Sequence, residues 1–219
     1  MKFSKDDIRN AMLLYAVTDH RWLKEGQSLL RVCDDVLSNG ATFLQIREKD
    51  LDADSFETEA AKLRELCIRH KVPYVVNDSV EIALAIDADG VHVGQSDIKG
   101  RDIRSIIGPD KILGISAGTV DEAIAAETAG ADYIGVGAVF VTSTKKNARN
   151  LTVEKLREIS SAVSIPVVAI GGINENNLME LSGSGVDGVA VVSAIFAAQD
   201  PGKATSRLLE LAKEMVAHG

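Results

Sequence analysis

The feature that most constrains the fold of this chain is a regular alternation of short apolar runs with longer amphipathic stretches. The apolar runs cover residues 13–18, 42–47, 74–77, 90–93, 112–116, 133–136, 167–170 and 188–192. Each run has the length of a strand, and between the runs apolar residues recur at helical spacing, as at Leu29, Val32 and Val36. The alternation predicts eight successive strand–helix units.

Eight such units in 219 residues indicate an α/β fold, a single-domain (β/α)8 TIM barrel that spans residues 1–219. The runs are rich in Val, Ile, Ala and Gly, which suits parallel strands buried on both faces. Residues 1–11 precede the first run and are expected to form a short N-terminal helix that closes the bottom of the barrel. A doubly wound open sheet is the alternative, but it needs a topological switch point, and the near-equal units argue against one.

Charge and cysteine content restrict the partners. Lys plus Arg total 24 against 32 Asp plus Glu, so this acidic chain is a poor nonspecific binder of nucleic acid or of an anionic membrane. The N-terminal residues are charged, and no apolar run approaches the ~18 residues of a membrane span, so we expect a cytoplasmic protein. Cys33 and Cys67 fall in helical patterns and are expected to be buried thiols.

Polar residues gather directly after the apolar runs, which is where barrels of this kind carry their chemistry. Gln45, Arg47 and Lys49 occupy alternate positions at the end of the second run and so share one face of the predicted strand. An amide and two cations on one face suit a phosphate or a pyrophosphate. The alternative is a solvated strand end, and we favour the anion site because the rest of this strand is predicted to be buried.

Two aspartates follow consecutive predicted strands. Asp78 comes after the third run and Asp97 after the fourth, so their carboxylates are expected to converge at one edge of the barrel. Oxygen ligands without Cys nearby favour a hard cation such as Mg²⁺. The alternative for each aspartate alone is a helix N-cap. His92 lies within the fourth run, where a single histidine is more typical of core than of catalysis.

The last two strand ends carry the pattern of a phosphate site. Gly171-Gly172 follows the seventh run and Ser193 the eighth, and loops at these positions recurrently bind phosphate in such barrels. The alternative is a simple tight turn. After the sixth run, Thr142, Thr144 and Lys145 lie in a polar stretch that suits an anion-gripping lid or, equally, a solvated surface loop.

With these residues assembled, the chain resembles the thiamine phosphate synthase family over nearly its whole length. The resemblance rests on YAVTD, QIREK, VND, GVHVGQSD, GISAGT, TSTKK, AIGGI and GVAVVSAI, in this order. It implies a Mg²⁺-dependent (β/α)8 transferase that joins 4-amino-2-methyl-5-(diphosphooxymethyl)pyrimidine to 4-methyl-5-(2-phosphoethyl)thiazole and releases pyrophosphate. The chain departs from the family at Gly118, where His is frequent, and at Gly137-Ala138, where Gly-Pro is frequent.

The resemblance also implies roles for individual residues. The pyrimidine pyrophosphate would be held by Gln45, Ile46, Arg47, Glu48, Lys49, Asn77, Ser116 and Lys145. The thiazole phosphate would be held by Thr142, Ser143, Thr144, Gly172, Val192 and Ser193. Arg47 and Lys145 would act in catalysis on the leaving pyrophosphate, and Asp78 and Asp97 would bind the magnesium ion.

Three other functions fit parts of the pattern. A thiazole tautomerase of the same fold needs no pyrophosphate site, and a phosphosugar isomerase or epimerase needs an acid/base pair that the sequence does not present convincingly. A non-catalytic phosphate-ligand binding barrel has little reason to keep both Asp78 and Asp97. All these interpretations imply small-molecule ligands, no nucleic acid and no membrane, and they allow a homo-oligomer.

Overall fold

The computed structural model describes residues 3–141 and 151–218, and its eight parallel strands close into a barrel in sequence order. The strands are β1 Leu14–Val17, β2 Phe43–Ile46, β3 Tyr74–Asn77, β4 Gly90–Val93, β5 Ile112–Ala117, β6 Tyr133–Gly137, β7 Val167–Ile170 and β8 Gly188–Val191. The ring closes because β1 pairs with β2 on one side and with β8 on the other. The predicted (β/α)8 barrel is confirmed, and the alternative of an open sheet is wrong.

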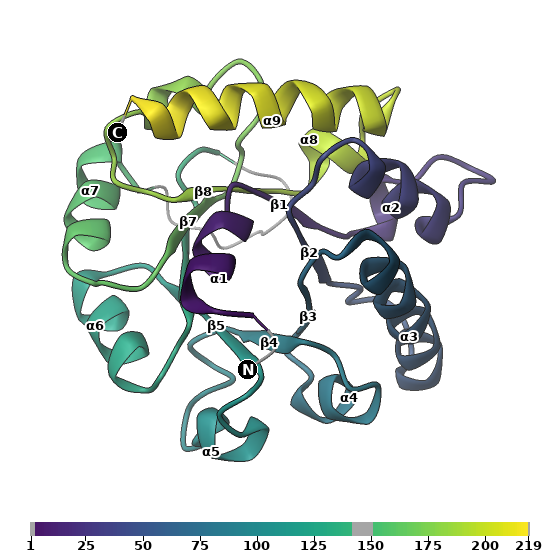
Figure 1. Ribbon diagram of the computed structural model, residues 1–219, viewed down its shortest axis with the longest axis horizontal. Coiled ribbons are helices and arrows are strands. Elements are labelled where there is room, and N and C mark those ends of the chain that lie inside the picture. Colours follow the sequence, from purple (N-terminus) through teal and green to yellow (C-terminus); the bar gives the residue numbers. More distant parts are fainter. Residues whose placement is uncertain (1–2, 142–150, 219) are drawn as a thin grey trace.

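Helices surround this ring of strands (Figure 1). The α-helices are α1 Lys5–Ala11, α2 Leu29–Ser38, α3 Ala53–His70, α4 Val80–Ala85, α5 Ile103–Ile107, α6 Val120–Thr128, α7 Val153–Ser161, α8 Ser193–Phe196 and α9 Pro201–Ala217, and the short 3-10 helices are η1 His20–Trp22 and η2 Leu178–Leu181. Most crossover helices begin at a side-chain cap, and two of these caps, Ser79 before α4 and Thr119 before α6, come directly after the end of the preceding strand. Early caps keep several of the loops at the carboxyl ends of the strands short.

The connection between β7 and β8 departs from the expected strand–helix unit. Its only helical turn in the described residues is η2, a 3-10 helix of four residues. The segment that follows contains Gly183 and Gly185, both with positive φ, and polar residues such as Asn177 flank the turn. Glycine and short polar side chains favour turns over α-helix, so apolar spacing alone overestimated the helix here.

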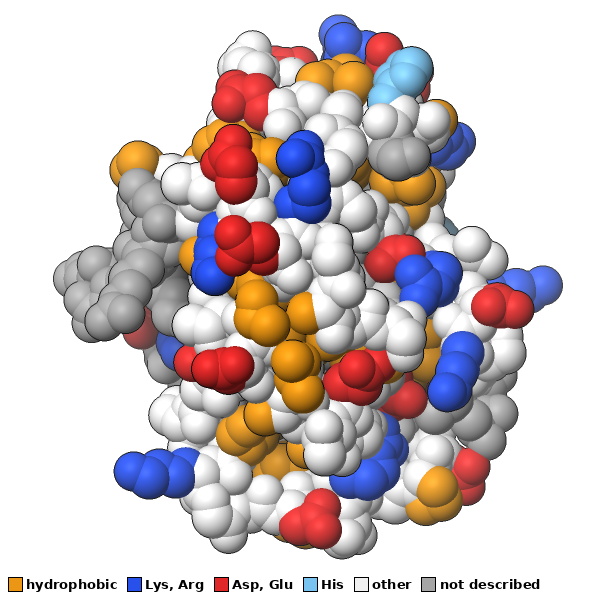
Figure 2. All heavy atoms as spheres, turned by 90° about the vertical axis from the view of Figure 1, so that its left-hand side faces the viewer, with side chains coloured by type: hydrophobic (Ala, Val, Ile, Leu, Met, Phe, Trp, Pro, Cys, Tyr) orange, Lys and Arg blue, Asp and Glu red, His pale blue; other side chains and the backbone are white. Residues whose placement is uncertain are grey.

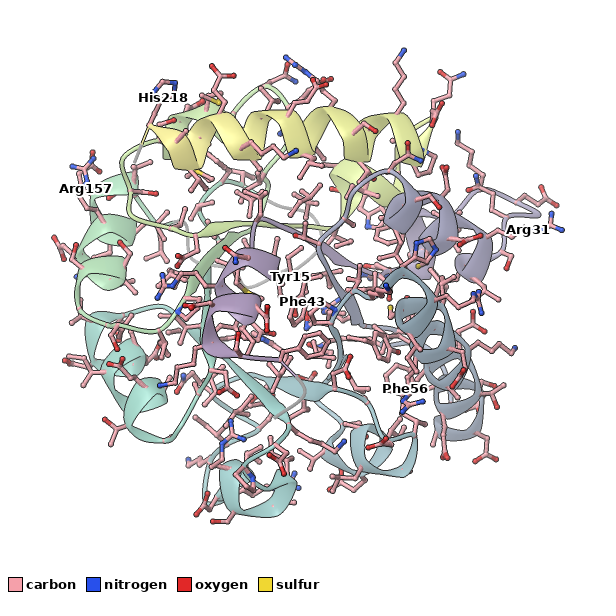
Figure 3. All side chains as sticks on the ribbon, in the orientation of Figure 1. Tyr15, Arg31, Phe43, Phe56, Arg157 and His218 are labelled. Carbon is pink, nitrogen blue, oxygen red and sulfur yellow. The ribbon has the colours of Figure 1, made fainter. Side chains whose placement is uncertain are left out.

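The core has two layers on either side of the strands. Outward-facing strand residues pack against the helices, and α2 buries the face predicted for it, with Val32, Cys33 and Val36 among its buried side chains. Inward-facing residues form a second cluster around Tyr15 and Phe43, whose rings lie in the barrel interior with centroids 4.4 Å apart (Figure 3).

The N-terminal helix α1 belongs to the inner cluster. Its Ile8 and the following Met12 are buried against inward-facing side chains that include Tyr15 and Val75. Arg9 adds a hydrogen bond of 2.7 Å to the carbonyl of Ser164 and an ion pair with Asp187. The short helix predicted to close the bottom of the barrel is therefore confirmed, with bounds at Lys5–Ala11.

The two thiols are buried, as the cysteine analysis predicts. On the face formed by α6 and α7, acidic and basic side chains of the described residues are interspersed, with no continuous basic patch (Figure 2). Cys33 and Cys67 are both buried thiols, and burial raises the pKa of Cys33. Within the described part of the chain, no helix has the length and apolar character needed to cross a membrane.

Candidate active site

A cavity of about 660 Å³ opens at the carboxyl ends of the strands, and every strand contributes to its lining. Its wall runs from Gln45 and Asn77 through Ser116 to Ile170 and Ala190. Cavities of this size are typical of small-molecule sites. The structure thus places the candidate site at the end of the barrel where the sequence predicts it.

The alternating residues at the end of β2 and directly after it separate into two sets, as their spacing predicts. Gln45, Arg47 and Lys49 line the cavity, whereas Ile46 and Glu48 do not. Ile46 packs in the outer core. The Glu48 carboxylate is fully buried and accepts a hydrogen bond from the backbone N–H of His20 at 2.8 Å. The same carboxylate lies 2.6 Å from the Nδ1 atom of the His20 ring. The side chains of Ile46 and Glu48 therefore support the loops outside the cavity.

Arg47 is held in place from the end of β1. Its backbone N–H donates to Thr18 Oγ1 at 3.0 Å, and its guanidinium Nη1 lies 3.9 Å from Asp19 Oδ2. Asp19 is buried and accepts hydrogen bonds from the Arg21 guanidinium at 2.8 and 2.6 Å. Burial acts to raise the pKa of Asp19, but the hydrogen bonds and charge of Arg21 outweigh it and lower that pKa. Asp19 is consequently an anion at neutral pH that orients two guanidinium groups.

The end of β3 brings an amide and a carboxylate beside these cations. Gln45 Nε2 donates to Asn77 Oδ1 at 3.4 Å, and Lys49 Nζ lies 3.8 Å from Asp78 Oδ2. Asp78 adopts φ 62°, a left-handed conformation that is uncommon for residues other than glycine and is often found at functional sites. Its side chain faces the cavity rather than capping a helix, since Ser79 is the N-cap of α4.

Asp97 approaches Asp78 from the end of β4. Burial and the negative charge of Asp97 raise the pKa of Asp78, and Lys49 opposes that rise. Asp97 Oδ2 also accepts the backbone N–H of Gly94 at 2.8 Å, which fixes its position, and the N-cap of α5 is Asp102. The alternative that Asp78 and Asp97 are merely helix caps is therefore wrong for both.

The paired carboxylates suit a magnesium ion. In the described residues, no group of three or more His, Cys, Asp or Glu side chains is placed to hold a metal. Mg²⁺ commonly takes one or two protein carboxylates and completes its shell with water and substrate phosphates. Two like charges close enough for Asp97 to raise the pKa of Asp78 are a donor set that a divalent cation would stabilise.

On the opposite wall, the loop after β7 is fixed by two asparagines. Gly172 has φ 69°, and its carbonyl accepts hydrogen bonds from the amides of Asn174 at 3.1 Å and Asn177 at 3.0 Å. A Cβ on Gly172 would overlap the Val141 carbonyl and lie 2.8 Å from Phe140 Cβ. Glycine is therefore required at position 172 by the backbone conformation and by the close packing of Phe140 and Val141, which follow β6.

The same wall continues into the loop after β8. Val192 and Ser193 line the cavity, and Ser193 begins the short helix α8. The backbone N–H groups of Ile195 and Phe196 in α8 donate to the Val192 carbonyl at 3.1 and 3.0 Å, which fixes the start of this helix. Gly172, Val192 and Ser193 are thus brought together as the sequence predicts. Thr142, Ser143, Thr144 and Lys145 lie outside the described residues.

Several lining residues were not predicted. Tyr15 and His92 project from inside the barrel, and Gln95 and Glu122 lie at the cavity wall. Gln95 Nε2 donates to the Ser116 carbonyl at 2.6 Å, and Glu122 accepts the backbone N–H of Gly118 at 2.6 Å. The position of His92 could have been predicted from the alternation of residues in β4. His92 stands between Val91 and Val93, which both face the outer core, so its own side chain must face the barrel interior.

Fold and site together define a (β/α)8 barrel protein whose rim has an acidic and basic side and a glycine-lined side, an arrangement typical of enzymes that act on phosphorylated small molecules. The family model described as thiamine monophosphate synthase matches residues 14–195. The chain belongs to this family.

Individual relatives are similar to this chain over most of their length. The chain is 47% identical to the thiamine-phosphate synthase of Ruminiclostridium cellulolyticum, covering 90% of this chain and 94% of that one. It is 46% identical to the thiamine-phosphate synthase of Methanobrevibacter smithii, covering 90% and 93%. The solved structure of thiamine phosphate pyrophosphorylase from Pyrococcus furiosus superposes with a TM-score of 0.86 at 39% identity, covering 95% and 99%.

Proposed function

We propose that the chain is a thiamine-phosphate synthase that joins the pyrimidine pyrophosphate to the thiazole phosphate and releases pyrophosphate. The observation that carries the proposal is one cavity with two walls of different chemistry. Arg47, Lys49 and Asn77 stand on one wall, and Gly172 and Ser193 on the other. An enzyme that joins two phosphorylated molecules needs both walls at once, and family membership agrees with this interpretation.

The first wall is assigned to the pyrophosphate. Arg47 is largely buried against Asp19, and Lys49 is half-exposed beside Asp78, so the two cations face the cavity from fixed anchors. Negative charge accumulates on the leaving group as its C–O bond breaks, and preorganised cations stabilise that charge most in the transition state. Arg47 is therefore proposed as a catalytic residue, and Lys145 is proposed from the sequence for the same task.

Asp78 and Asp97 are proposed to hold Mg²⁺ next to this wall. When bound, the ion would supply positive charge to the pyrophosphate oxygens as a Lewis acid. The two carboxylates fit this task because they lie at the ends of neighbouring strands, and Lys49 keeps one of them oriented. Ser116 and Asn77 are proposed to add neutral hydrogen bonds to the same substrate.

The second wall is assigned to the thiazole phosphate. Its glycine-containing loop is fixed by Asn174 and Asn177, so the backbone near Gly172 is held in one orientation. The proposed reaction needs no protein nucleophile. The C–O electron pair leaves with pyrophosphate, and the lone pair of the thiazole nitrogen forms the new C–N bond to the pyrimidine methylene carbon.

A direct assay tests the proposal. Purified protein is incubated with both substrates, with and without Mg²⁺, and thiamine phosphate and pyrophosphate are measured. We expect both products in equal amounts, only with both substrates present and only with the divalent ion. A thiazole tautomerase would instead act on a single thiazole substrate and release no pyrophosphate, and a binding protein would yield no product.

A further inference from the structure

Four side chains form a continuous hydrogen-bonded row inside the barrel. Tyr15 Oη lies 2.8 Å from Tyr133 Oη, which lies 3.0 Å from His92 Nδ1. On the other side of the ring, His92 Nε2 lies 3.0 Å from Ser116 Oγ. The row therefore links strands β1, β6, β4 and β5 and ends at a hydroxyl that lines the cavity.

The direction of the hydrogen bonds follows from the two tyrosines. Tyr15 and Tyr133 are fully buried, and burial raises the pKa of both phenols, so both keep their protons at neutral pH. Among the described residues, the acceptor within hydrogen-bond distance of the Tyr15 hydroxyl is Tyr133 Oη. Tyr15 therefore donates to Tyr133, and Tyr133 must use its own proton to donate to His92 Nδ1.

This direction determines the tautomer of the histidine. A neutral imidazole that accepts at Nδ1 carries its proton at Nε2, and that proton is donated to Ser116 Oγ. The opposite direction would make Tyr133 an acceptor from His92 and leave one of the two buried phenol protons, that of Tyr15 or that of Tyr133, without an acceptor, which is unfavourable. An imidazolium would donate from both nitrogens and meet the same conflict. With Oγ already accepting from His92, the Ser116 proton is available for donation to a ligand.

Glycines in the two neighbouring strands make room for the row. A Cβ on Gly114 would overlap the Tyr133 ring and lie 2.6 Å from His92 Nδ1. A Cβ on Gly135 would lie 3.2 Å from His92 Cε1. Residues without side chains thus stand where Tyr133 and His92 meet, which indicates that the strand sequences are adapted to this contact.

We propose that His92 is a positioning residue, held as the Nε2–H tautomer by Tyr133 and Tyr15, that directs the Ser116 hydroxyl proton toward a phosphate oxygen of the substrate in the cavity. The orientation of the row follows from its contacts and from the burial of the two phenols, and the nature of the acceptor rests on the proposed function. This role of His92 differs from core packing because it acts through the hydroxyl proton of Ser116 at the cavity wall.

The tautomer is tested first, independently of activity. The chain is labelled with ¹⁵N-histidine, and the ring nitrogens are recorded by NMR at neutral pH. The chain has four histidines, so loss of one signal set in His92→Gln identifies the residue. We expect the proton of His92 on Nε2 and a shift toward a tautomer mixture in Tyr133→Phe. A proton mainly on Nδ1, or on both nitrogens, would overturn the proposal.

Two matched variants then test the action on Ser116. The amide nitrogen of His92→Gln reaches toward the place of Nε2 and still donates, whereas His92→Asn reaches only toward the place of Nδ1 and leaves Ser116 without its donor. Loss of one hydrogen bond in a dry site predicts a roughly tenfold lower kcat for His92→Asn, with part of the rate kept in His92→Gln. Melting curves establish that both variants fold.

The decisive control is the Ser116→Ala background. If His92 acts through Ser116, adding His92→Asn to Ser116→Ala lowers kcat no further. An undiminished tenfold loss in that background would show that His92 serves the core, and the positioning role would be wrong. If the wild type forms no thiamine phosphate, the proposed function fails, and the NMR result alone still decides the tautomer.

Discussion

Lys49 Nζ lies 3.8 Å from Asp78 Oδ2, so a cation from the end of β2 stands beside a carboxylate from the end of β3. Asp97 from the next strand adds a second negative charge that raises the pKa of Asp78. We propose that these opposite charges on neighbouring strand ends bind a divalent cation and the pyrophosphate oxygens together. In the proposed function, this charged arrangement distinguishes the pyrophosphate side of the cavity from the glycine-lined side.

Asp78→Asn tests the metal site with little change of shape. Asparagine tolerates the left-handed backbone at this position, so the fold is expected to persist. Removing one carboxylate weakens the attraction for Mg²⁺, and the Mg²⁺ concentration that gives half-maximal thiamine phosphate formation should rise at least roughly tenfold. Asp87→Asn is the matched control, because Asp87 also has positive φ and carries a carboxylate, but pairs with Arg64 and Lys111 away from the cavity. Equal Mg²⁺ dependence in both variants would contradict the metal site.

Arg47→Ala tests the stabilisation of the leaving group. Loss of one charge-stabilising group of this kind commonly lowers kcat by about 10²–10³, and Arg47→Lys should recover part of that loss because it keeps the charge without the planar fork. Arg21→Ala is the control, since Arg21 also pairs with Asp19 but does not line the cavity. Steady-state kinetics with both substrates should give Arg21→Ala a much smaller decrease. A similar decrease in both variants would mean that the loss of kcat comes from disturbing Asp19 and not from removing a cation beside the leaving group.

The sequence was sufficient for the architecture because parallel strands buried on both faces appear as continuous apolar runs. Three runs, at 74–77, 90–93 and 167–170, coincide with β3, β4 and β7. The alternation of Gln45, Arg47 and Lys49 was equally informative, since a strand of period two separates cavity side chains from supporting ones.

The contacts inside the barrel could not be predicted in the same way. Tyr15 and Tyr133 are 118 positions apart, and their hydrogen bond depends on strand register and on space left by Gly114. The pairing of Asp19 with Arg21 depends on the turn η1, for which apolar spacing gives no signal. The Tyr15–Tyr133 contact arises from the three-dimensional closure of the barrel, and the Asp19–Arg21 contact from the geometry of a single turn, and apolar patterns encode neither.

Gly172→Ala is predicted to destabilise the fold itself, independently of any effect on phosphate binding. A residue with a Cβ is strained in the left-handed backbone conformation of Gly172, and the Cβ would also overlap the Val141 carbonyl. Gly26→Ala separates the two effects, because Gly26 has φ 78° but no atom lies within 4 Å of the place that a Cβ would take. Urea unfolding should show a loss of about 1 kcal/mol for Gly26→Ala and roughly 1–3 kcal/mol more for Gly172→Ala. Equal losses would argue against close packing of the loop on Gly172.

Asp19→Asn is predicted to change how stability depends on pH. Although burial acts to raise it, the pKa of Asp19 in the folded protein is lowered by Arg21, below the value of about 3.9 expected for the unfolded chain. A lowered carboxyl pKa adds stability that is fully present above the unfolded pKa and is lost as the pH falls through the folded pKa. At pH 7 the variant should therefore be less stable than the wild type, by on the order of 1–2 kcal/mol for charge-assisted hydrogen bonds to a partly exposed guanidinium. The difference should shrink as the pH falls below about 4, where the carboxyl of the unfolded wild-type chain takes up a proton and that of the folded protein follows at lower pH.

Urea unfolding between pH 7 and pH 3 measures this difference directly. Asp50→Asn is the matched control, because Asp50 lies 3.8 Å from the same Arg21 but is mostly exposed, and exposed ion pairs contribute little. The control should follow the wild-type curve throughout. Because Asp19 also holds Arg47, Asp19→Asn should in addition lower kcat at pH 7, where the fold is intact. A stability difference that stays constant from pH 7 to pH 3 would mean that the Asp19 carboxyl does not titrate with a lowered pKa, and that its contribution to the fold is packing rather than charge.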